Sequence, residues 1–211
     1  MLSRLNGLAW LACTALSLSW SLGAHAAGNP ADGEKKFYTC YGCHGIDNYR
    51  NAYPAYSVPK LRHQHASYII AALHEYQNGE RPHATMHAQA ASLSDQDIED
   101  IAAYLQGPEP TKPSPPTSSG NPPKQVAACV ACHGETGLGV ESPLTPKPAV
   151  LAGQHVDYLE EALTAYRNGR RKNVVMGGMT KLLTSDEDIK IAAEYFAGQA
   201  SPLATATTDS K

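Results

Sequence analysis

Two pentapeptides of one pattern, Cys-x-x-Cys-His, stand 89 residues apart in this chain of 211 residues. They read Cys40-Tyr41-Gly42-Cys43-His44 and Cys129-Val130-Ala131-Cys132-His133. Two cysteines three positions apart lie on one helical turn, so both can add to the vinyl groups of a single haem. The histidine that follows is then placed under the iron as an axial ligand. The pattern predicts covalent haem attachment at both cysteine pairs, with His44 and His133 as iron ligands.

Three other uses of such cysteine pairs fit the sequence less well. A redox-active pair needs no histidine after it, and half of a zinc site would require two further ligands at regular spacing. Structural disulfides would not explain two pentapeptides of the same pattern. The expected cofactors are therefore two covalently bound haem c groups.

An internal repeat predicts the domain organisation. The segment from Leu61 to Met86 matches the segment from Leu151 to Met176 at Leu, Gln-His, Tyr, Ala-Leu, Tyr, Asn-Gly, Arg and Met positions, with a constant offset of 90 residues. Two copies of one small domain follow, at residues 27–106 and 125–198. Each copy is too small to be well stabilised by its own side chains, which is a deficit that a bound cofactor relieves.

The segments outside the two copies differ from them in composition. Residues 107–124 contain seven prolines in 18 residues, which predicts an extended linker, because proline fixes φ and lacks a backbone donor. Residues 199–211 lack apolar periodicity and are expected to be disordered. Residues 1–26 combine Arg4, an apolar stretch and an Ala-x-Ala triplet, which predicts a cleaved signal peptide and export to the periplasm. Retention of this stretch as a membrane anchor is the alternative.

Apolar spacing predicts helices and no convincing strand. Residues 67–78 and 156–168 are amphipathic, and each is followed by a glycine at which a helix can stop. The last segment of each copy opens with a serine, Ser94 or Ser185, followed three residues later by an acid, which is an N-cap signature. We therefore expect an all-α fold, with two small domains in tandem that each wrap around one covalent haem.

The second axial ligand should repeat as the histidines do. Met86 and Met176 occupy matching positions, 42 and 43 residues after the predicted histidine ligands. They are the predicted second ligands. Met179 is the alternative in the second copy, but it aligns with Gln89.

Two histidines of the first copy compete with its methionine. His83 and His87 flank the methionine in sequence. Their counterparts are Asn173 and Gly177, which cannot bind iron. The repeat therefore favours methionine in both copies.

Other repeated positions receive structural interpretations. Pro59 and Pro148, each 15 residues after its histidine, are candidates to accept the second ring N–H of that histidine through a backbone carbonyl. Gln64 and Gln154, each followed by a histidine, are expected to cap a helix. Four tyrosines at matching positions are expected to pack against haem: Tyr68, Tyr76, Tyr158 and Tyr166. One basic cluster precedes Met176 and faces either solvent or a partner: Arg167, Arg170, Arg171 and Lys172.

These motifs resemble those of the dihaem class I cytochromes c of the cytochrome c4 type. The resemblance covers both copies through the Cys-x-x-Cys-His-Gly motifs, the Leu-Ala-Gly-Gln-His segment at 151–155, the Tyr-x-Asn-Gly-x-Arg segments and the Leu-[Ser/Thr]-x-x-Asp-Ile helix starts. It implies a periplasmic protein whose irons are bound by His and Met and which carries electrons from a quinol-oxidising complex towards terminal oxidases. It also implies a leucine seven residues after the ligand methionine, which fits Met86 and Met176.

The sequence departs from the family's pattern at two places. The second copy has only residues 124–128 ahead of its cysteine motif, where the family has a full helix. The family joins its domains tightly, whereas residues 107–124 form a long proline-rich stretch. We therefore expect domains whose relative orientation varies and haems that titrate nearly independently.

The predicted function is electron transfer rather than catalysis. Ligation by His and Met leaves no open coordination site, which argues against a dihaem peroxidase. A net charge of −3 offers nucleic acid no basic surface. The expected partners are redox proteins, with a quinol-oxidising complex or dehydrogenase as donor and a terminal oxidase or reductase as acceptor, and at most peripheral membrane association. The alternative is the electron-accepting cytochrome subunit of a dehydrogenase, such as a sulfide-oxidising flavocytochrome.

Overall fold

The computed structural model describes residues 28–53, 55–108, 121–143 and 145–207. The predicted signal peptide and most of the predicted linker lie outside these ranges. Within them, the secondary structure consists of helices joined by loops, with two isolated bridges between extended residues. The all-α prediction is confirmed. No helix in the described part of the chain is long and apolar enough to cross a membrane.

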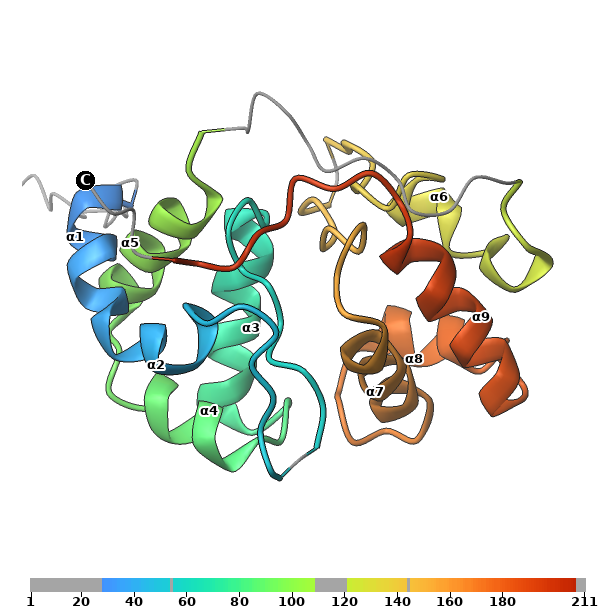
Figure 1. The fold of residues 1–211 in the computed structure, drawn as a ribbon, viewed down its shortest axis with the longest axis horizontal. Coiled ribbons are helices and arrows are strands. Elements are labelled where there is room, and N and C mark those ends of the chain that lie inside the picture. Colours follow the sequence, from blue (N-terminus) through green and yellow to red (C-terminus); the bar gives the residue numbers. More distant parts are fainter. Residues whose placement is uncertain (1–27, 54, 109–120, 144, 208–211) are drawn as a thin grey trace, which may run out of the picture.

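The helices form two groups that lie side by side, as Figure 1 shows. The first domain contains α1 (Pro30–Lys36), the 3-10 turn η1 (Phe37–Cys40), α2 (Tyr41–His44), α3 (Ala66–Asn78), α4 (Ala84–Ala90) and α5 (Asp95–Gln106). The second domain contains the 3-10 turn η2 (Lys124–Val126), α6 (Val130–His133), α7 (Val156–Arg167), α8 (Val174–Thr180) and α9 (Asp186–Ala197). The helices α2 to α5 therefore correspond in order to α6 to α9.

The predicted long helices and their ends are found in both domains. Gly79 follows α3 with a φ of 78°, a left-handed conformation that glycine adopts without a Cβ clash. Ser94 and Ser185 each form a capping box with the aspartate three residues later. In each domain the first long helix packs against the last one, α3 on α5 and α7 on α9, and buries the apolar face that the spacing predicts.

Two short helices, α4 and α8, have no counterpart among the predicted elements. Each has seven residues, which is too short for apolar periodicity to be informative. The His83 side chain accepts a hydrogen bond from the Met86 N–H through Nδ1 at 3.3 Å, and Asn173 Oδ1 accepts one from the Met176 N–H at 3.0 Å. These N-caps fix the helical turn that carries each predicted methionine ligand.

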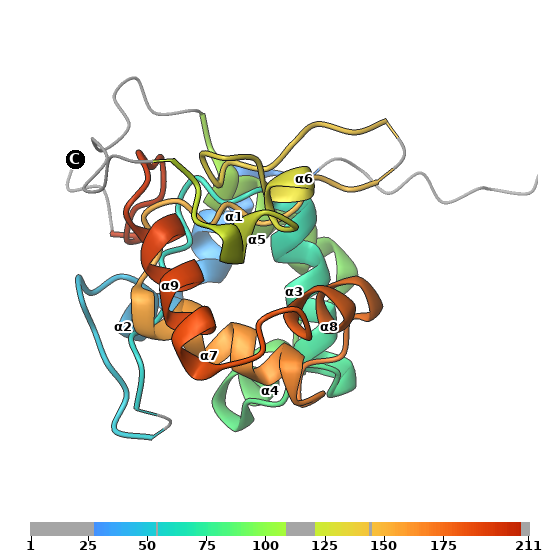
Figure 2. The same cartoon turned by 90° about the vertical axis from the view of Figure 1, so that its right-hand side faces the viewer.

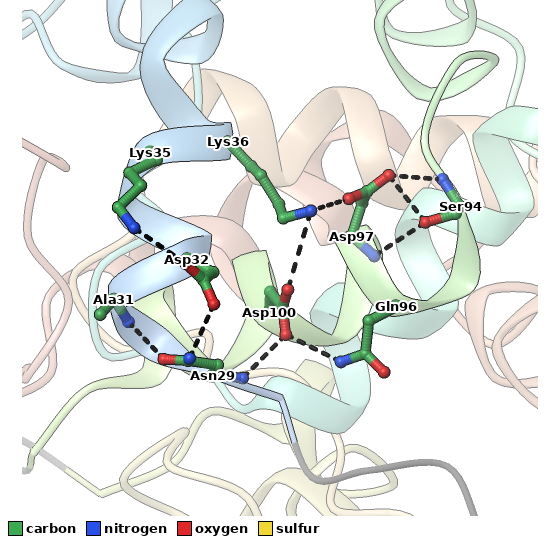
Figure 3. Close-up of polar contacts among 9 residues, drawn as sticks. All are labelled: Asn29, Ala31, Asp32, Lys35, Lys36, Ser94, Gln96, Asp97 and Asp100. Carbon is green, nitrogen blue, oxygen red and sulfur yellow. Dashed lines mark hydrogen bonds and ion pairs between the residues drawn. The ribbon is translucent and has the colours of Figure 1, made fainter.

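In the described part of the chain, the helix α1 has no counterpart in the second domain. It packs on α5, and Gly33 permits the close approach because a Cβ there would overlap the backbone carbonyl of Asp100. Figure 3 shows the polar contacts along this seam, where Lys36 pairs with Asp97 and the Asn29 N–H donates to Asp100 Oδ1 at 2.8 Å. The first domain is thus tied together by its leading helix.

The second domain has only the turn η2 at the equivalent place, as its short leading segment predicts. Gln125 takes the position of Lys36, and its Nε2 donates to Asp188 Oδ1 at 3.2 Å. Val126 is fully buried in the core of the second domain. One turn and one amide therefore replace a helix and an ion pair.

The two domains are docked, so the expectation of a variable relative orientation is wrong. Gln64 Nε2 donates to the Val150 carbonyl at 3.0 Å, and Gln64 Oε1 accepts from the Val150 N–H at 2.7 Å. Gln154 makes the same pair of bonds with the Lys60 backbone, at 3.1 and 2.9 Å. Because residue 60 is the counterpart of residue 150, these reciprocal bonds relate the domains by an approximate twofold axis.

This docking also corrects the interpretation of the two glutamines as helix caps. The N-caps of α3 and α7 are His65 and His155, and neither makes a side-chain cap bond. The interface is extended by Asp157, which accepts from the Ser57 N–H at 2.9 Å and pairs with Arg50 at 3.1 Å. A long linker permits separation without requiring it, and here the interface decides the arrangement.

Residues 199–207 also differ from the prediction, because they are packed rather than disordered. Ser201, Leu203 and Ala206 are buried. Figure 1 shows this segment leaving α9 and running back across to the first domain, and Figure 2 views the molecule from the side of the second domain. The segment lacks apolar periodicity because it is extended and is held largely by backbone bonds, which leave no trace in the hydrophobic pattern.

Candidate haem-binding sites

The structure brings the four residues predicted for the first haem around one cavity. The segment η1–α2 carries Cys40, Cys43 and His44, and α4 carries Met86. All four border a cavity of about 260 Å³, which continues between the domains as far as Leu159. The cavity therefore unites residues that lie up to 46 positions apart in the sequence.

His44 is buried and held by a single carbonyl. Its exposed fraction is 8%, and its Nδ1 lies 3.1 Å from the carbonyl oxygen of Pro59. Burial lowers the pKa of the His44 imidazole to about 4, and the bond to Pro59 only partly opposes this shift. The ring is thus neutral at pH 7, with Nδ1–H donating to Pro59 and Nε2 left as the nitrogen that can bind a metal.

His133 has the same environment, but its partner is not the predicted one. Its Nδ1 lies 3.1 Å from the carbonyl oxygen of Ala149 rather than that of Pro148. Counting 15 residues from the histidine fails because the second domain has one extra residue between His133 and this position; Ala149 is the true counterpart of Pro59. Burial lowers the pKa of His133 as well.

Cys40 and Cys129, the first cysteines of the two motifs, are partly buried. Burial raises the pKa of the Cys40 and Cys129 thiols, and all four cysteines after the leader are free of disulfides. Among the described residues, no group of three or more His, Cys, Asp or Glu side chains could hold a metal ion.

The predicted ligand methionines differ in exposure from Met179. Met86 and Met176 are both half-buried, whereas Met179 is 39% exposed. His83 is engaged as the N-cap of α4, and His87 Nδ1 lies 2.8 Å from the carbonyl oxygen of Tyr76. These contacts give both histidines local roles and support methionine as the second ligand.

Two buried arginines between the domains are a feature that the sequence analysis does not predict. Arg81 and Arg171, which are counterparts in the repeat, have exposed fractions of 5% and 8%. The Arg81 guanidinium lies 4.7 Å from the centre of the Tyr76 ring, and that of Arg171 lies 4.8 Å from the centre of the Tyr166 ring. Arg81 also donates to the Tyr158 hydroxyl. Their repeated place in the Asn-Gly-x-Arg segments is the signal that could have identified them.

The basic cluster ahead of Met176 is therefore not uniformly exposed. Arg171 is buried, whereas Arg167 pairs with Asp186 and Arg170 with Glu161 at 2.8 Å. Of the tyrosines predicted to pack against haem, Tyr68, Tyr76 and Tyr158 border the cavity that contains the first motif, and Tyr158 also accepts a hydrogen bond from Arg81 across the interface.

The arginine pair tests whether a haem fits here. No carboxylate of the described residues forms an ion pair with Arg81 or Arg171, and Arg171 Nε and Nη2 are buried without a hydrogen-bond partner in the described structure. Burial would raise the pKa of Tyr158, but both guanidiniums outweigh it and lower the pKa to about 8. Buried cations without an acid require an anion. The two carboxylates of a haem match that requirement, so the residues present fit the group.

Comparison with known proteins assigns the family. A cytochrome c family model matches residues 30–107. The chain is 32% identical to cytochrome c4 of Pseudomonas aeruginosa over 191 residues, covering 83% of this chain and 90% of that relative. The chain belongs to the cytochrome c4 family. The crystal structure of reduced cytochrome c4 from Pseudomonas stutzeri superposes with a TM-score of 0.63 at 29% identity, covering 82% of this chain and all of that one.

One further relative has a different name. The chain is 33% identical to a thiosulfate dehydrogenase electron acceptor from Stutzerimonas stutzeri, covering 86% of this chain and 95% of that relative. Membership of the cytochrome c4 family confirms the predicted family, the tandem class I domains and the two covalently bound haem c groups. The protein is an electron-transfer cytochrome rather than an enzyme.

Proposed function

We propose that this protein is a periplasmic dihaem electron carrier with one His- and Met-ligated haem in each domain. Cys40 and Cys43 would hold the first haem, with His44 and Met86 as its iron ligands. The equivalent residues of the second domain are Cys129, Cys132, His133 and Met176. The observation that carries the proposal is the cavity bordered by both cysteines, the neutral His44 ring and Met86 together.

The haem supplies a one-electron couple, and ligation by His and Met leaves it no open coordination position. The chain's residues control the rest. The Pro59 and Ala149 carbonyls fix the tautomer and orientation of His44 and His133. Arg81 and Arg171 would hold haem carboxylates at the domain interface, and their charge would disfavour the oxidised, more positive iron.

Cofactor content tests this proposal directly. The mature protein should carry two covalently bound haems, and acid-acetone extraction should leave the colour with the polypeptide. Replacement of Cys129 and Cys132 by Ala should halve the haem content and leave the first site loaded. Recovery of one haem from the unaltered protein, or of zinc instead, contradicts the assignment.

Export and partners are the finer part of the proposal. The predicted signal peptide at residues 1–26 supports a periplasmic location, where a quinol-oxidising complex would donate electrons and a terminal oxidase or reductase would accept them. Fractionation of cells that express the full chain should recover the haem-loaded protein in the periplasm, shortened by 26 residues. Recovery in the membrane with residues 1–26 retained would favour an anchor.

A second candidate function is that of an electron acceptor for a dehydrogenase. It is favoured by the similarity to the thiosulfate dehydrogenase electron acceptor. The oxidised protein should then be reduced by a thiosulfate dehydrogenase and thiosulfate faster than by a quinol-oxidising complex. Co-purification with a flavoprotein and reduction by sulfide would identify the flavocytochrome version of this alternative.

A further inference from the structure

The segment of residues 199–207, here called the C-terminal strap, belongs to the second domain in sequence but contacts both domains. It leaves α9, passes along the second domain and reaches the first domain beside α5 and α2, as Figures 1 and 2 show. Its two halves are held by different means.

The first half of the strap is fixed to the second domain. Ser201 donates through its hydroxyl to the Ala152 carbonyl, and Leu203, which is 4% exposed, forms a buried cluster with Val150 and Ala152. Gly153 makes room for this path, because a Cβ there would clash with the Ser201 side chain.

The first domain differs at the position of Gly153. Its residue there is His63, which adopts the same left-handed conformation, with φ values of 64° and 65°. A side chain therefore stands where Gly153 makes room for the strap in the second domain.

The second half of the strap completes the first domain. Arg62 and Ala204 form an antiparallel bridge, with N–H to O distances of 3.1 and 3.2 Å in the two directions. Ala206 is fully buried in the core cluster that contains Phe37, Ile101 and Leu105. A side chain from the second domain's end is thus part of the first domain's core.

The strap also ends on the residue predicted to bind the first iron. The Ala206 N–H donates to the His44 carbonyl at 3.0 Å. This carbonyl lies at the end of the four-residue helix α2, where carbonyls have no partner within the helix. In the second domain the equivalent His133 carbonyl accepts from the Gly139 N–H at 2.9 Å, within its own loop. The strap thus provides the hydrogen-bond donor for this carbonyl in the first domain, whereas the second domain provides the donor from its own loop.

We propose that the C-terminal strap is a positioning element for the first haem site, supplied by the second domain, with Ala206 as its positioning residue. This inference rests on the proposed ligation of the first iron by His44. The strap holds the turn that carries His44 and seals the core behind it against water. The reduction potential of the first haem then depends on a segment of the other domain, whereas that of the second haem does not depend on the first domain in the same way.

Two shortened versions of the haem-loaded protein test the inference by comparison with the full-length protein. One ends at Ala200 and removes the strap, and the control ends at Thr207 and leaves the strap complete. The first should lower the potential of the first haem, because water that reaches a haem site stabilises the charged oxidised form. The second haem should keep its potential, and the control should match the unaltered protein. The haems are assigned to domains by the shifts that Met86→Ala and Met176→Ala produce.

A pair of point variants covers the case in which the shorter chain does not fold. Ala204 is exposed and Ala206 is buried on the same segment, so Ala206→Asp should displace the strap and reproduce the truncation, whereas Ala204→Asp should change nothing. Ala206→Ser, which keeps the size and the N–H, should retain the original potential.

Unchanged potentials in both the truncation and Ala206→Asp overturn the inference, as does an equal shift of both haems. These outcomes are distinguishable from failure of the proposed function. A chain that carries two covalent haems with unchanged potentials refutes only the strap, whereas a chain without covalent haem refutes the proposed function.

Discussion

The segment that carries Met86 borders the first cavity with Thr85 and Gln89 of α4 and with Ser92, which follows the helix. The equivalent positions of the second domain hold Val175, Met179 and Leu182. Three polar side chains of one copy are thus three apolar side chains of the other, and two of the three lie on a helix with the same length and the same kind of N-cap. By contrast, Gln64 and Arg81 of the interface are matched by Gln154 and Arg171. The repeat is thus kept at these interface residues and altered at the three positions around each methionine.

The comparison has a physical consequence for electron transfer. An apolar shell around a metal site limits access of water and favours the less charged, reduced form. The second site should therefore have the higher potential of the two. Electrons that enter at either haem would then come to rest on the second one.

The largest expected effect comes from the methionines, whose equivalence underlies the comparison. Met86→Ala and Met176→Ala should each remove about half of the weak sulfur-to-iron band at the red end of the oxidised spectrum and lower one potential, because the thioether ligand favours the reduced iron. Met179→Ala is the matched control and should retain the whole band. If Met179→Ala loses the band and Met176→Ala retains it, the sequence alignment that pairs Met86 with Met176 is wrong.

The next effect concerns the interface that the two copies share. Gln64→Ala and Gln154→Ala each remove two hydrogen bonds across the interface and one to the N–H of the following histidine. They leave the backbone of residue 150 or 60 without its partners. We expect each to cost about 2 kcal/mol of unfolding free energy, since lost bonds with buried partners left unsatisfied cost more than exposed ones. Gln96→Ala, which removes one bond to Asp100 within the first domain, is the control and should cost clearly less.

The symmetry of the interface can be measured in the same experiment. The bonds of the two glutamines are reciprocal, so their separate replacements should cost nearly equal amounts, measured by denaturant unfolding. A difference of more than about twofold would show that the domains contribute unequally to the interface.

A smaller effect should follow from exchanging the three side chains around the methionines between the domains. The triple variant Val175→Thr, Met179→Gln, Leu182→Ser gives the second domain the side chains of the first. Its second haem should fall in potential towards the first, while the first haem stays unchanged, as a redox titration would show. The reverse exchange, Thr85→Val with Gln89→Met and Ser92→Leu, should raise the first potential. If the potential of the second haem does not change in the triple variant, the polarity of these three side chains is not the cause of a difference between the two potentials.

Much of each domain was predictable because its signals are local. The cysteine motifs and the helix ends at Gly79 and Ser94 depend on residues close in sequence. The helices α4 and α8 were missed because seven residues carry too little periodicity. The neutral His44 ring was placed correctly on the Pro59 carbonyl, but the same counting failed for Pro148 after a one-residue insertion.

The contacts between domains were not predictable in the same way. Nothing near Gln64 in sequence indicates that its amide will meet Val150, and an arginine beside others, as Arg171 is, reads as a solvated charge. The proline-rich composition of the linker favoured domains that lie apart. Composition limits how far apart the domains can lie, but it does not indicate how strongly they bind each other. Ala206 illustrates the extreme case, since an alanine in a polar tail completes a core more than a hundred residues away.

The smallest effect concerns the capping boxes of the two domains. They differ in the side chain that bonds to the capping aspartate, which is Lys36 in the first domain and Gln125 in the second. The pKa of Asp97 is lowered to about 2, first by Lys36 and then by Ser94, and that of Asp188 is lowered to about 2, first by Gln125 and then by Ser185. An unfolded aspartate has a pKa of about 3.9. Between these folded and unfolded pKa values the folded chain binds fewer protons than the unfolded chain. The stabilisation that comes from the two charged aspartates is therefore present above about pH 4 and is lost as the pH falls towards 2.

The two capping boxes should therefore respond alike to acid but differently to salt. Lys36→Gln should lower the unfolding temperature of the first domain slightly at low salt and not at about 1 M salt, because exposed ion pairs are weak and screened. Gln125→Lys should raise the unfolding temperature of the second domain slightly, with the same salt dependence. Both variants are measured by thermal unfolding at pH 7. If Lys36→Gln is equally destabilising at both salt concentrations, the side chain acts by packing α1 onto α5 rather than by charge. The two capping boxes would then differ in packing alone.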